Sequence, residues 1–381
     1  MKKPHYFGYV GGSEHPADRV VIEALQEAGL QRVYGKSWDI LWYLSGDPPL
    51  HVIDQIEPHQ KLNHFPKSAI MCNKLKMYRT LKPAFDRIKT VPKSNELRFF
   101  AHTWSMPEER KALEDYSIRH PEMRFIIKPK IGAWGIDIRV IDQLEDIPPG
   151  NSWLVQEYLD KPYLYRGYKF NLRLFALLAS IEPFVLYVYR DGYVDLAGEV
   201  WQPGASGSHN LMHNTNSGIQ KQCKRNDSLS QSISFANWLQ SIETDGVDTE
   251  PLWQRIIEVI AKSLICVQPH LITSIGELPI QSSNCFELFG FDVMLDEQLN
   301  PWVIEHNRSP SMTMEFIPSI KRELVRDLLR VVNIDSSTRP LANDSRTIED
   351  QPTHSYPGKV GGFERVYPSN FSANLDHWFT I

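Results

Sequence analysis

Apolar residues in this chain occur in short runs of branched and aromatic residues and in a few longer stretches with helical spacing. Short runs of this kind are typical of strands, and helical spacing is typical of amphipathic helices. The predicted strands are Tyr6–Val10, Gln31–Tyr34, Leu50–Ile53, Phe125–Lys130, Ile138–Ile141, Trp153–Tyr158, Phe170–Ser180, Phe184–Tyr189, Tyr193–Leu196, Phe286–Leu295 and Trp302–His306. The predicted helices run from about Pro16 to Gly29, through Lys74–Arg79, from about Met106 to His120, over Pro251–Val267 and over Pro318–Val332. This mixture predicts a fold of the α/β (α+β) class.

The connections between these elements predict parts of the topology. Three strands and a helix within the first 60 residues predict a small parallel sheet. The strands between Phe170 and Leu196 are predicted to form a meander, with Asp191-Gly192 as a hairpin turn. Residues 202–248 are polar and rich in Ser, Asn and Gly, which favours a long loop with a flexible part. Residues 335–360 have the composition of a disordered segment.

The composition narrows the class of protein only a little. The chain has 381 residues, a net charge of −5 and 42% hydrophobic residues, which is ordinary for a globular protein. A negative net charge gives no reason to expect nucleic acid as a partner. Apolar runs such as Leu174–Ile181 are too short to span a bilayer, and the first residues contain no apolar signal core. Cysteines without CxxC spacing favour buried thiols in a reducing compartment: Cys72, Cys223, Cys266 and Cys285. We therefore expect a cytoplasmic protein without a membrane partner and, because no heptad repeat occurs, a monomer.

The most informative segment is Cys285–Ser311, which predicts a β-hairpin carrying three oxygen ligands. If the hairpin closes symmetrically about Gln298–Leu299, Asp292 lies opposite Glu305. Because side chains alternate between faces, Asn307 then lies on the same face as Glu305. Two carboxylates and an amide oxygen suit Mg²⁺, whose remaining ligands are commonly phosphates and water. The alternative is that Asp292 only ends a register and Glu305 faces solvent, although both acids interrupt apolar strands, where an unpaired buried carboxylate is costly.

A second group of residues indicates phosphate binding. The segment FIIKPKIGAWGIDIRVI predicts a strand, a glycine loop and a strand, and backbone N–H groups around Gly132 and Gly135 could cradle phosphates. Taken alone, two glycines in a hairpin are more often an ordinary loop. Lys128 ends the strand before this loop, and Lys169 opens another apolar strand. Two strand-borne lysines, a glycine loop and a carboxylate hairpin together resemble the parts of an ATP-grasp nucleotide site.

Several motifs, in the same order, resemble those of the tubulin-tyrosine-ligase-like proteins, the ATP-grasp ligases that join amino acids to tubulin and some other proteins. The resemblance covers nearly the whole chain and is carried by NHFP, CNKLKMYR, KPKIGAWG, LVQEYLDKP, GYKFNLRLF, HNTNSGIQK, FELFGFDVMLDEQLNPWVIEHNRSP and GGFERVYP. It implies an ATP-grasp fold with a small N-terminal α/β subdomain (1–60), a central subdomain with phosphate loop and adenine hinge (61–160) and a C-terminal ATP-grasp catalytic subdomain (161–334). A flexible segment (335–360) and a C-terminal strand with a tail (361–381) would follow.

The resemblance also implies a role for each site residue, with ATP and two Mg²⁺ ions as the cofactors. The metal ligands would be Asp292, Glu305 and Asn307. The catalytic residues would be Arg173, Lys169 and Glu305, with Arg173 orienting a substrate carboxylate or the acyl phosphate. The nucleotide-binding residues would be Lys74, Lys128, Gly132, Gly135, Gln156, Glu157, Leu159, Lys169, Asn171, Thr215 and Asn216. The lysines would screen the phosphates, while Gln156 and the backbone of Glu157 and Leu159 would meet adenine.

Three positions depart from the family's pattern. Asn171 stands where the family has an aspartate, which removes a charge near the ribose or the acceptor. Asp137 replaces a glycine two residues after Gly135 and would either repel phosphate or hold the loop differently. Asp195 stands where the family has an arginine on the acceptor or amino-acid side, so the sign of the charge is reversed. Arg190 lies close in sequence, on a face that the pattern leaves open.

The function that the resemblance implies is ATP- and Mg²⁺-dependent ligation of a free amino acid to a protein acceptor through an acyl phosphate. Tyrosine, glutamate and glycine stay open as the amino acid, and a tubulin tail is the acceptor that the family implies. Basic clusters at Lys61–Lys67, Lys74–Arg79 and Lys221–Arg225 could attract an acidic tail or could simply be solvated. The departures keep open two alternatives: a nucleotide- or tubulin-binding protein without ligase activity, and an ATP-grasp ligase for a non-tubulin protein or a small peptide. His213 would contact substrate or cap a loop, and His306 would be packed or face solvent.

Overall fold

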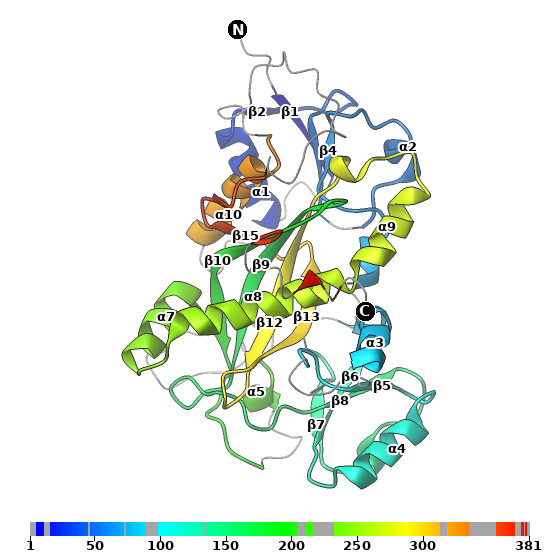
Figure 1. Ribbon diagram of the computed structural model, residues 1–381, viewed down its shortest axis with the longest axis vertical. Helices are drawn as coiled ribbons and strands as arrows, with labels where there is room; N and C mark the ends of the chain where they lie inside the picture. Colours follow the sequence, from blue (N-terminus) through cyan, green and yellow to red (C-terminus); the bar gives the residue numbers. More distant parts are fainter. Residues whose placement is uncertain are drawn as a thin grey trace.

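A computed structural model describes residues 5–10, 16–44, 46–71, 74–88, 98–132, 135–204, 210–215, 232–312, 318–334, 356–369, 375–376 and 378. In this part of the chain the architecture is mixed α/β with three sheets, which confirms the predicted class (Figure 1).

The first sheet is small, parallel and N-terminal, as predicted. Its order is β2–β1–β3–β4, formed by β1 His5–Val10, β2 Leu30–Arg32, β3 Ile40–Tyr43 and β4 Lys61–Leu62, and α1 Pro16–Glu27 connects β1 to β2. The predicted strand Leu50–Ile53 is wrong, because these residues form the short helix α2 after Pro49 at its N-cap. The strand beside β1 is β3 instead, whose four residues are all buried. A run of four apolar residues has too few positions to separate helix from strand by periodicity.

The second sheet is antiparallel and has its own apolar core. Its order is β5–β8–β6–β7, formed by β5 Thr103–Ser105, β8 Trp153–Glu157, β6 Phe125–Pro129 and β7 Arg139–Ile141. Trp104, Leu113 and Phe125 are among the buried residues of this core. Helix α3 Lys74–Ile88 precedes the sheet, and α4 Arg110–Arg119 packs on it. The helix predicted from Met106 begins later, because Met106–Glu109 form a turn.

The third sheet is the largest, with seven strands in antiparallel pairs. Its order is β13–β12–β9–β10–β15–β14, and β11 also pairs with β10. The strands are β9 Phe170–Ile181, β10 Phe184–Leu196, β11 Ser232–Ser234, β12 Glu287–Leu295, β13 Pro301–Arg308, β14 Lys359–Val360 and β15 Phe363–Tyr367. The last of these is the C-terminal strand expected from the GGFERVYP motif.

The hairpin turn predicted at Asp191-Gly192 is wrong, because β10 continues through it as one strand. The pairing of β10 with β9 instead shifts register between Val188 and Gly192, and the Asp191 carboxylate accepts a hydrogen bond from the Gly192 N–H at 2.7 Å. A Cβ atom on Gly192 would lie 2.2 Å from the carbonyl oxygen of Arg173. The glycine therefore permits close approach of two strands at a bulge.

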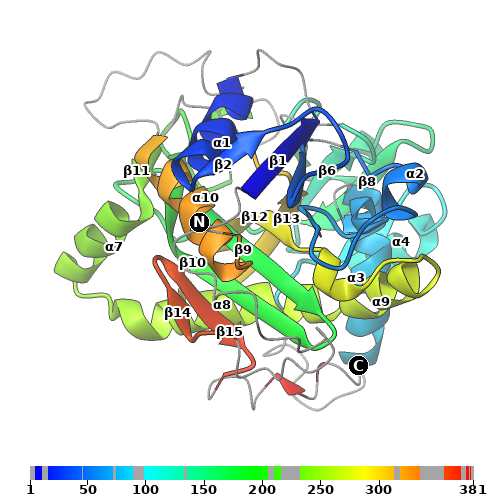
Figure 2. The same cartoon turned by 90° about the horizontal axis from the view of Figure 1, so that it is seen from above.

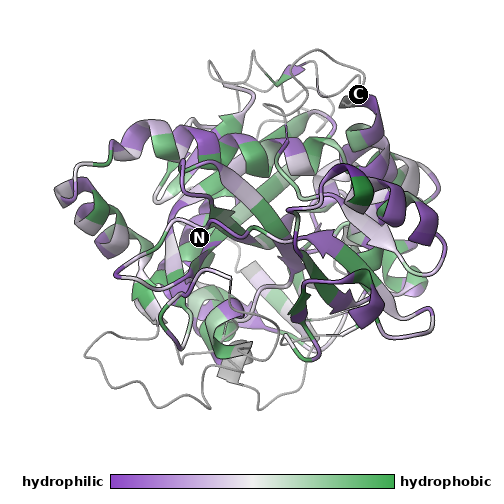
Figure 3. Ribbon diagram, turned by 90° about the horizontal axis from the view of Figure 1, so that it is seen from below, coloured by the Kyte–Doolittle hydropathy of each residue, from purple (hydrophilic) through white to green (hydrophobic). Residues whose placement is uncertain are grey.

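Helices cover both faces of the large sheet (Figure 2). One face packs against α8 Thr249–Ile265, with α7 Phe235–Thr244 and α9 Gln268–Gly276 beside it, and the other packs against α10 Pro318–Val331 and α1. The stretch Thr249–Gly276 is long and apolar enough to cross a membrane by length and composition. Hydrophobic and hydrophilic residues are interleaved along α8 (Figure 3), and its apolar residues belong to the core under the sheet, as in a buried helix of a globular protein.

The loop predicted for residues 202–248 contains more regular structure than expected. It includes α5 Asn210–His213, β11 and α7, whereas residues 205–209 and 216–231 lie outside the described residues. Residues 335–355 of the segment predicted to be disordered also lie outside them, and residues 359–360 form β14. Short 3₁₀ turns in the described part of the chain include η1 Ser68–Met71, η3 Leu144–Asp146 and η4 Ser282–Asn284.

Candidate functional site

One end of β9 carries polar residues on a face that is apolar elsewhere. Leu172 and its even-numbered neighbours face α8, and Phe175 on the opposite face belongs to the core with α10. At the beginning of the strand, Lys169, Asn171 and Arg173 occupy the alternate positions that continue the Phe175 face. The alternation thus places two cations and an amide in one row.

The hairpin β12–β13 brings the predicted metal ligands together. Asp292 lies opposite Glu305 in the register, as predicted, and the Asn307 side chain donates to a Glu305 carboxylate oxygen at 3.2 Å, so both lie on one face. The premise of symmetrical closure is wrong, however. The strands close about Gln298, with Leu295 opposite Pro301, and an extra residue at Ile304 shifts the register before Glu305.

Asp292 connects the hairpin to β9. It lies opposite Arg173 in the β12–β9 register, and the Arg173 guanidinium donates two hydrogen bonds to its carboxylate, the Nη2 bond at 3.0 Å. Burial and the nearby Glu305 carboxylate raise the pKa of Asp292 although Arg173 opposes them. Burial also raises the pKa of Glu305, but Lys74, Arg173, Asn307 and Lys128 outweigh it, so that pKa is lowered. A divalent cation between the two carboxylates would relieve their repulsion.

The donor set fits a hard cation. Two carboxylates and one amide oxygen on adjacent strands are the partial oxygen set that Mg²⁺ takes from proteins. Among the described residues, no group of three or more His, Cys, Asp or Glu side chains gathers as a metal site, and the hairpin set is completed by an amide. Asp292, Glu305 and Asn307 could therefore hold Mg²⁺.

Two lysines are buried across from the hairpin. Lys128 on β6 donates to the side-chain oxygen of Gln156 on β8 at 2.6 Å, and Lys169 donates to the Tyr158 hydroxyl at 3.3 Å. The Lys169 ammonium also lies 4.6 Å from the centre of the Tyr158 ring and 5.7 Å from that of Trp201. Neither lysine forms an ion pair with a carboxylate of the described residues within 4.0 Å. The sequence interpretation missed Tyr158 and Trp201, which no motif singled out as contacts of a lysine.

Burial lowers the pKa of both lysines. The pKa of Lys128 falls to about 8, because burial and Lys74 lower it more than Glu305 and Asp292 raise it. The pKa of Lys169 falls to about 7, because burial and the neighbouring Lys128 disfavour its charge. A polyanion between these ammonium groups would favour their charged forms, so the arrangement is suited to phosphates.

The glycine loop lies beside the lysines. Lys74, the first residue of α3, donates to the Gly132 carbonyl oxygen at 3.0 Å. Gly135 has a φ of 72°, and its carbonyl oxygen accepts a hydrogen bond from the Asn214 side chain, which lies so close that a Cβ on Gly135 would clash with it. Asp137, the departure from the family's glycine, is exposed and has a φ of 60°, a conformation that glycine adopts without strain and that aspartate tolerates.

The predicted adenine hinge is fixed by the buried carboxylate of Glu157, for which the sequence interpretation gave a role to the backbone only. The Glu157 side chain accepts hydrogen bonds from the His102 N–H at 3.0 Å and from Arg98, Tyr116 and the His102 ring. Burial opposes ionisation, but these partners lower the pKa of Glu157 to about 2. The Glu157 N–H donates to the His102 carbonyl oxygen at 2.9 Å and is thereby occupied. Gln156 is held by Lys128 and by the Thr103 hydroxyl at 2.8 Å.

Asn171 and Asp195 lie opposite each other on β9 and β10. The Asn171 side chain is nine-tenths buried, and its oxygen has no hydrogen-bond partner among the described residues. Asp195 is half-buried, accepts a hydrogen bond from the Ser232 hydroxyl and has a pKa raised by burial, although Ser232, Arg173 and Lys321 oppose the shift. Two acceptor oxygens thus lie beside Arg173, a position suited to a donor group of a ligand.

The other named residues fall as follows. Arg190 points away from Asp195, since it pairs with Glu250 and with Glu364 at 3.3 Å. His306 is packed, which is one of the two alternatives predicted, and its Nε2 atom is hydrogen-bonded to the Ser263 hydroxyl at 2.6 Å. The Nδ1 atom of His213 is hydrogen-bonded to the Tyr158 hydroxyl at 2.7 Å. Thr215 and Leu159 lie within the described residues, but no contact there indicates how either would bind nucleotide. Asn216 lies outside the described residues.

Comparison with known proteins gives consistent matches. A model described as "Tubulin-tyrosine ligase family" matches residues 53–340. The chain is 33% identical over 334 residues to tubulin monoglutamylase TTLL4 of Homo sapiens, covering 84% of this chain and 27% of that protein. It is 30% identical over 374 residues to a probable beta-tubulin polyglutamylase of Tetrahymena thermophila, covering 87% and 31%. It is 30% identical over 394 residues to tubulin polyglutamylase TTLL6 of Mus musculus, covering 94% and 47%. The chain therefore spans about a quarter to a half of the length of these curated relatives.

Proposed function

Since the chain belongs to the tubulin-tyrosine ligase family, we propose that it is an ATP- and Mg²⁺-dependent ligase that joins an amino acid to a protein acceptor. The observation that carries the proposal is one arrangement of side chains. Asp292, Glu305 and Asn307 lie together on the β12–β13 hairpin, and the buried Lys128 and Lys169 lie across from them. Phosphoryl transfer needs positioning and neutralisation of charge more than covalent help, and these residues supply both.

The proposal includes an ATP-grasp fold. Nucleotide would lie between the second sheet, which carries Lys128, Gln156 and the glycine loop, and the third sheet, which carries Lys169 and the metal ligands. The sequence-based division into residues 1–60, 61–160, 161–334, 335–360 and 361–381 is kept as part of this proposal. The separate apolar core of the second sheet supports its central unit.

Each residue has a proposed task in the reaction. Asp292, Glu305 and Asn307 would hold one or two Mg²⁺ ions, which neutralise phosphate charge when bound. Lys128 and Lys169 would bind phosphates. Arg173 is fixed by Asp292 and would orient the substrate carboxylate that becomes the acyl phosphate.

The names of the relatives suggest the substrates. Because these proteins are tubulin glutamylases, we propose glutamate as the amino acid, a tubulin tail as the acceptor and microtubules as the place of action. The basic cluster Lys61–Lys67 supports this little, since Lys61 donates to the Ser283 carbonyl oxygen and Lys67 pairs with Glu277. On α3, Lys76 and Arg79 are exposed near Lys74 and suit an acidic tail better. The cluster at Lys221–Arg225 lies outside the described residues.

The test is intact-protein mass spectrometry of tubulin incubated with the pure protein, Mg-ATP and glutamate, tyrosine or glycine singly. A Glu305→Gln variant is the control. An added residue mass that is absent in the control supports the ligase and identifies its amino acid. No added mass on tubulin, with Mg-ATP bound tightly, would favour a different acceptor or a binding protein without ligase activity. The departures at Asn171 and Asp195 are the reason for considering these alternatives. Absence of Mg-ATP binding would refute the proposal as a whole.

A further inference from the structure

The end of the metal-bearing strand β13 is tied to the N-terminal unit by ion pairs. Arg308, which follows Asn307, pairs through Nη1 with Asp47 and donates through Nη2 to the Gly46 carbonyl oxygen. Its Nε atom lies 3.2 Å from a carboxylate oxygen of Glu287 on β12. We call Asp47, His64, Glu287 and Arg308 the seam clamp, because they join segments more than 200 residues apart in sequence.

Glu287 is the buried centre of the seam clamp. Its side chain has no exposed surface, and it accepts hydrogen bonds from His64 Nδ1 at 2.8 Å and from the Phe65 N–H at 3.0 Å. A buried carboxylate of this kind needs its partners, because a lost partner leaves a charge without compensation. Arg308 and His64 are also almost fully buried. The polar partners of Glu287 therefore help to fix how the N-terminal unit meets the hairpin, together with the Phe286 N–H, which donates to the Leu62 carbonyl oxygen at 3.0 Å.

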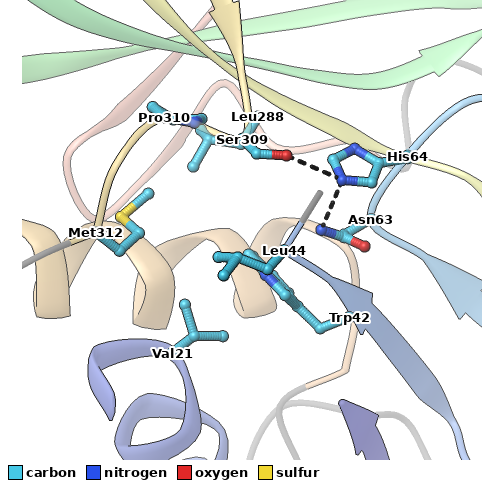
Figure 4. A pocket seen from close by; sticks show the side chains of 9 residues that line it. All are labelled: Val21, Trp42, Leu44, Asn63, His64, Leu288, Ser309, Pro310 and Met312. Atoms are coloured by element: carbon cyan, nitrogen blue, oxygen red, sulfur yellow. Dashed lines mark hydrogen bonds between the residues drawn. The ribbon is translucent and has the colours of Figure 1, made fainter. Parts of the chain in front are cut away.

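Apolar packing does not complete this seam. A narrow pocket remains between α1, β3 and the residues after β13, and it is lined mainly by apolar side chains such as Trp42, Leu288 and Met312 (Figure 4). At its polar corner the Ser309 hydroxyl lies 3.1 Å from His64 Nε2. Side chains that leave a gap cannot fix a strand end by close contact alone. The seam clamp therefore supplies polar connections at a point where apolar packing leaves a gap.

The seam clamp lies behind the candidate metal ligands. Residues alternate along β13, so Arg308 leaves the strand on the face opposite Asn307. Fixing the Arg308 side chain therefore fixes the backbone from which the Asn307 amide and, two residues earlier, the Glu305 carboxylate project.

We infer that Asp47 is a positioning residue for the metal-binding end of β13, acting through Arg308. The inference rests on the proposed function, because it requires Asn307 and Glu305 to bind the metal. Asp47 is suited to a test because its side chain is 41% exposed, so its replacement leaves no buried hole. The affinity of the metal site would then depend on a loop residue of the N-terminal unit that touches neither metal nor nucleotide.

The experiment measures Mn²⁺ binding in the presence of ATP by electron paramagnetic resonance, using the full chain. Replacement of a side chain that is hydrogen-bonded to a metal ligand typically weakens metal binding by about 10–100-fold. Asp47 acts on Asn307 only through Arg308 and the backbone, so Asp47→Asn should weaken Mn²⁺ binding less, by about three- to tenfold. Asp47→Glu keeps the charge on an exposed loop and should recover most of the affinity. Asp54→Asn removes an exposed acid at the end of α2 in the same unit and should change nothing.

Three results separate the possible failures. The inference is supported if Asp47→Asn weakens Mn²⁺ binding while its melting temperature and its affinity for metal-free ATP match those of the wild type. It is overturned if Mn²⁺ binding is unchanged, or if Asp54→Asn weakens it equally. Failure of the wild type to bind Mn²⁺ with ATP, or equal binding by Glu305→Gln, would instead refute the proposed metal site and the inference with it.

Discussion

Lys169 should make the affinity for Mg-ATP depend on pH above neutrality. Its ammonium is buried against Tyr158 and Trp201, and its pKa is lowered to about 7 by burial and by Lys128. Phosphate favours the charged form of the lysine. When the lysine is neutral in the free protein, binding of Mg-ATP must therefore be accompanied by uptake of a proton from solvent. Raising the pH therefore weakens binding, and the effect begins near pH 7.

The magnitude follows from that pKa. About half of Lys169 is charged at pH 7 and about 1% at pH 9, so a site that binds phosphate only with the charged lysine loses about fiftyfold in affinity over this range. Lys128, with a pKa of about 8, adds a further loss of up to about tenfold. ATP does not contribute to the change, because the second ionisation of a phosphate has a pKa of about 6 and is complete in this range.

The assay is isothermal titration calorimetry of Mg-ATP at pH 7, 8 and 9, repeated at pH 7 in two buffers of different ionisation enthalpy. The wild type should take up about half a proton at pH 7 through Lys169. Lys169→Met removes that uptake, and its disadvantage relative to the wild type should shrink as the pH rises, because both are then neutral at this position. A flat affinity from pH 7 to 9, or an equal slope in Lys169→Met, would refute the reasoning.

Other predictions follow from the same contacts. The folded-state pKa of Lys169 lies below its unfolded value of about 10.4, so the unfolded chain binds the extra proton and the free energy of unfolding should rise between about pH 7 and pH 10. Lys169→Met should therefore raise the free energy of unfolding at pH 7 by about 1–3 kcal/mol, as measured by thermal unfolding. A loss of stability would contradict this prediction. Glu305→Gln should lower Mg²⁺-dependent turnover by about 10²–10³-fold without unfolding the protein, as measured by ATP consumption and circular dichroism. Asp195→Asn should raise the KM for the amino acid by about 10–150-fold and change kcat little, because a hydrogen bond to a charged group contributes about 1.5–3 kcal/mol; an unchanged KM would remove Asp195 from the substrate side. Asp137→Gly should strengthen Mg-ATP binding a few-fold at low salt and less at high salt, since it removes an exposed negative charge beside the glycine loop.

The elements with long apolar patterns were predictable, and the short or interrupted ones were not. Helix α8 has apolar residues at helical spacing and strand β9 is a long, nearly continuous apolar run, and both appear close to the positions that the sequence predicts. The strand predicted for Leu50–Ile53 is wrong because four residues are too few to show the periodicity of a helix or of a strand. The hairpin turn predicted at Asp191-Gly192 is wrong for a different reason. The dipeptide that favours a hairpin turn also suits a bulge, and which of the two forms depends on the backbone of Arg173 in the neighbouring strand.

The candidate site was predictable as a set of residues but not as a set of contacts. The carboxylates and lysines interrupt apolar strands, where an ionisable side chain needs a reason, and this signal marked Asp292, Lys128 and Lys169. Their partners came from distant segments without such a signal. Tyr158 and Trp201 are ordinary aromatic residues in the sequence, and only the fold brings both to the Lys169 ammonium.

The pairing of Asp292 with Glu305 shows how a correct result followed from an incomplete premise. Val303 lies in the core with α8, while Glu305, two residues later, lies on the opposite face beside Arg173. Two residues of equal parity occupy opposite faces of a regular strand only if an extra residue intervenes, and the bulge at Ile304 is that residue. Without it, Ile304 would lie opposite Asp292, and Glu305 would turn its charge into the apolar core. The conflict between an apolar and an acidic residue at the same parity was visible in the sequence, and it is the signal by which such a bulge at a metal-binding hairpin can be predicted.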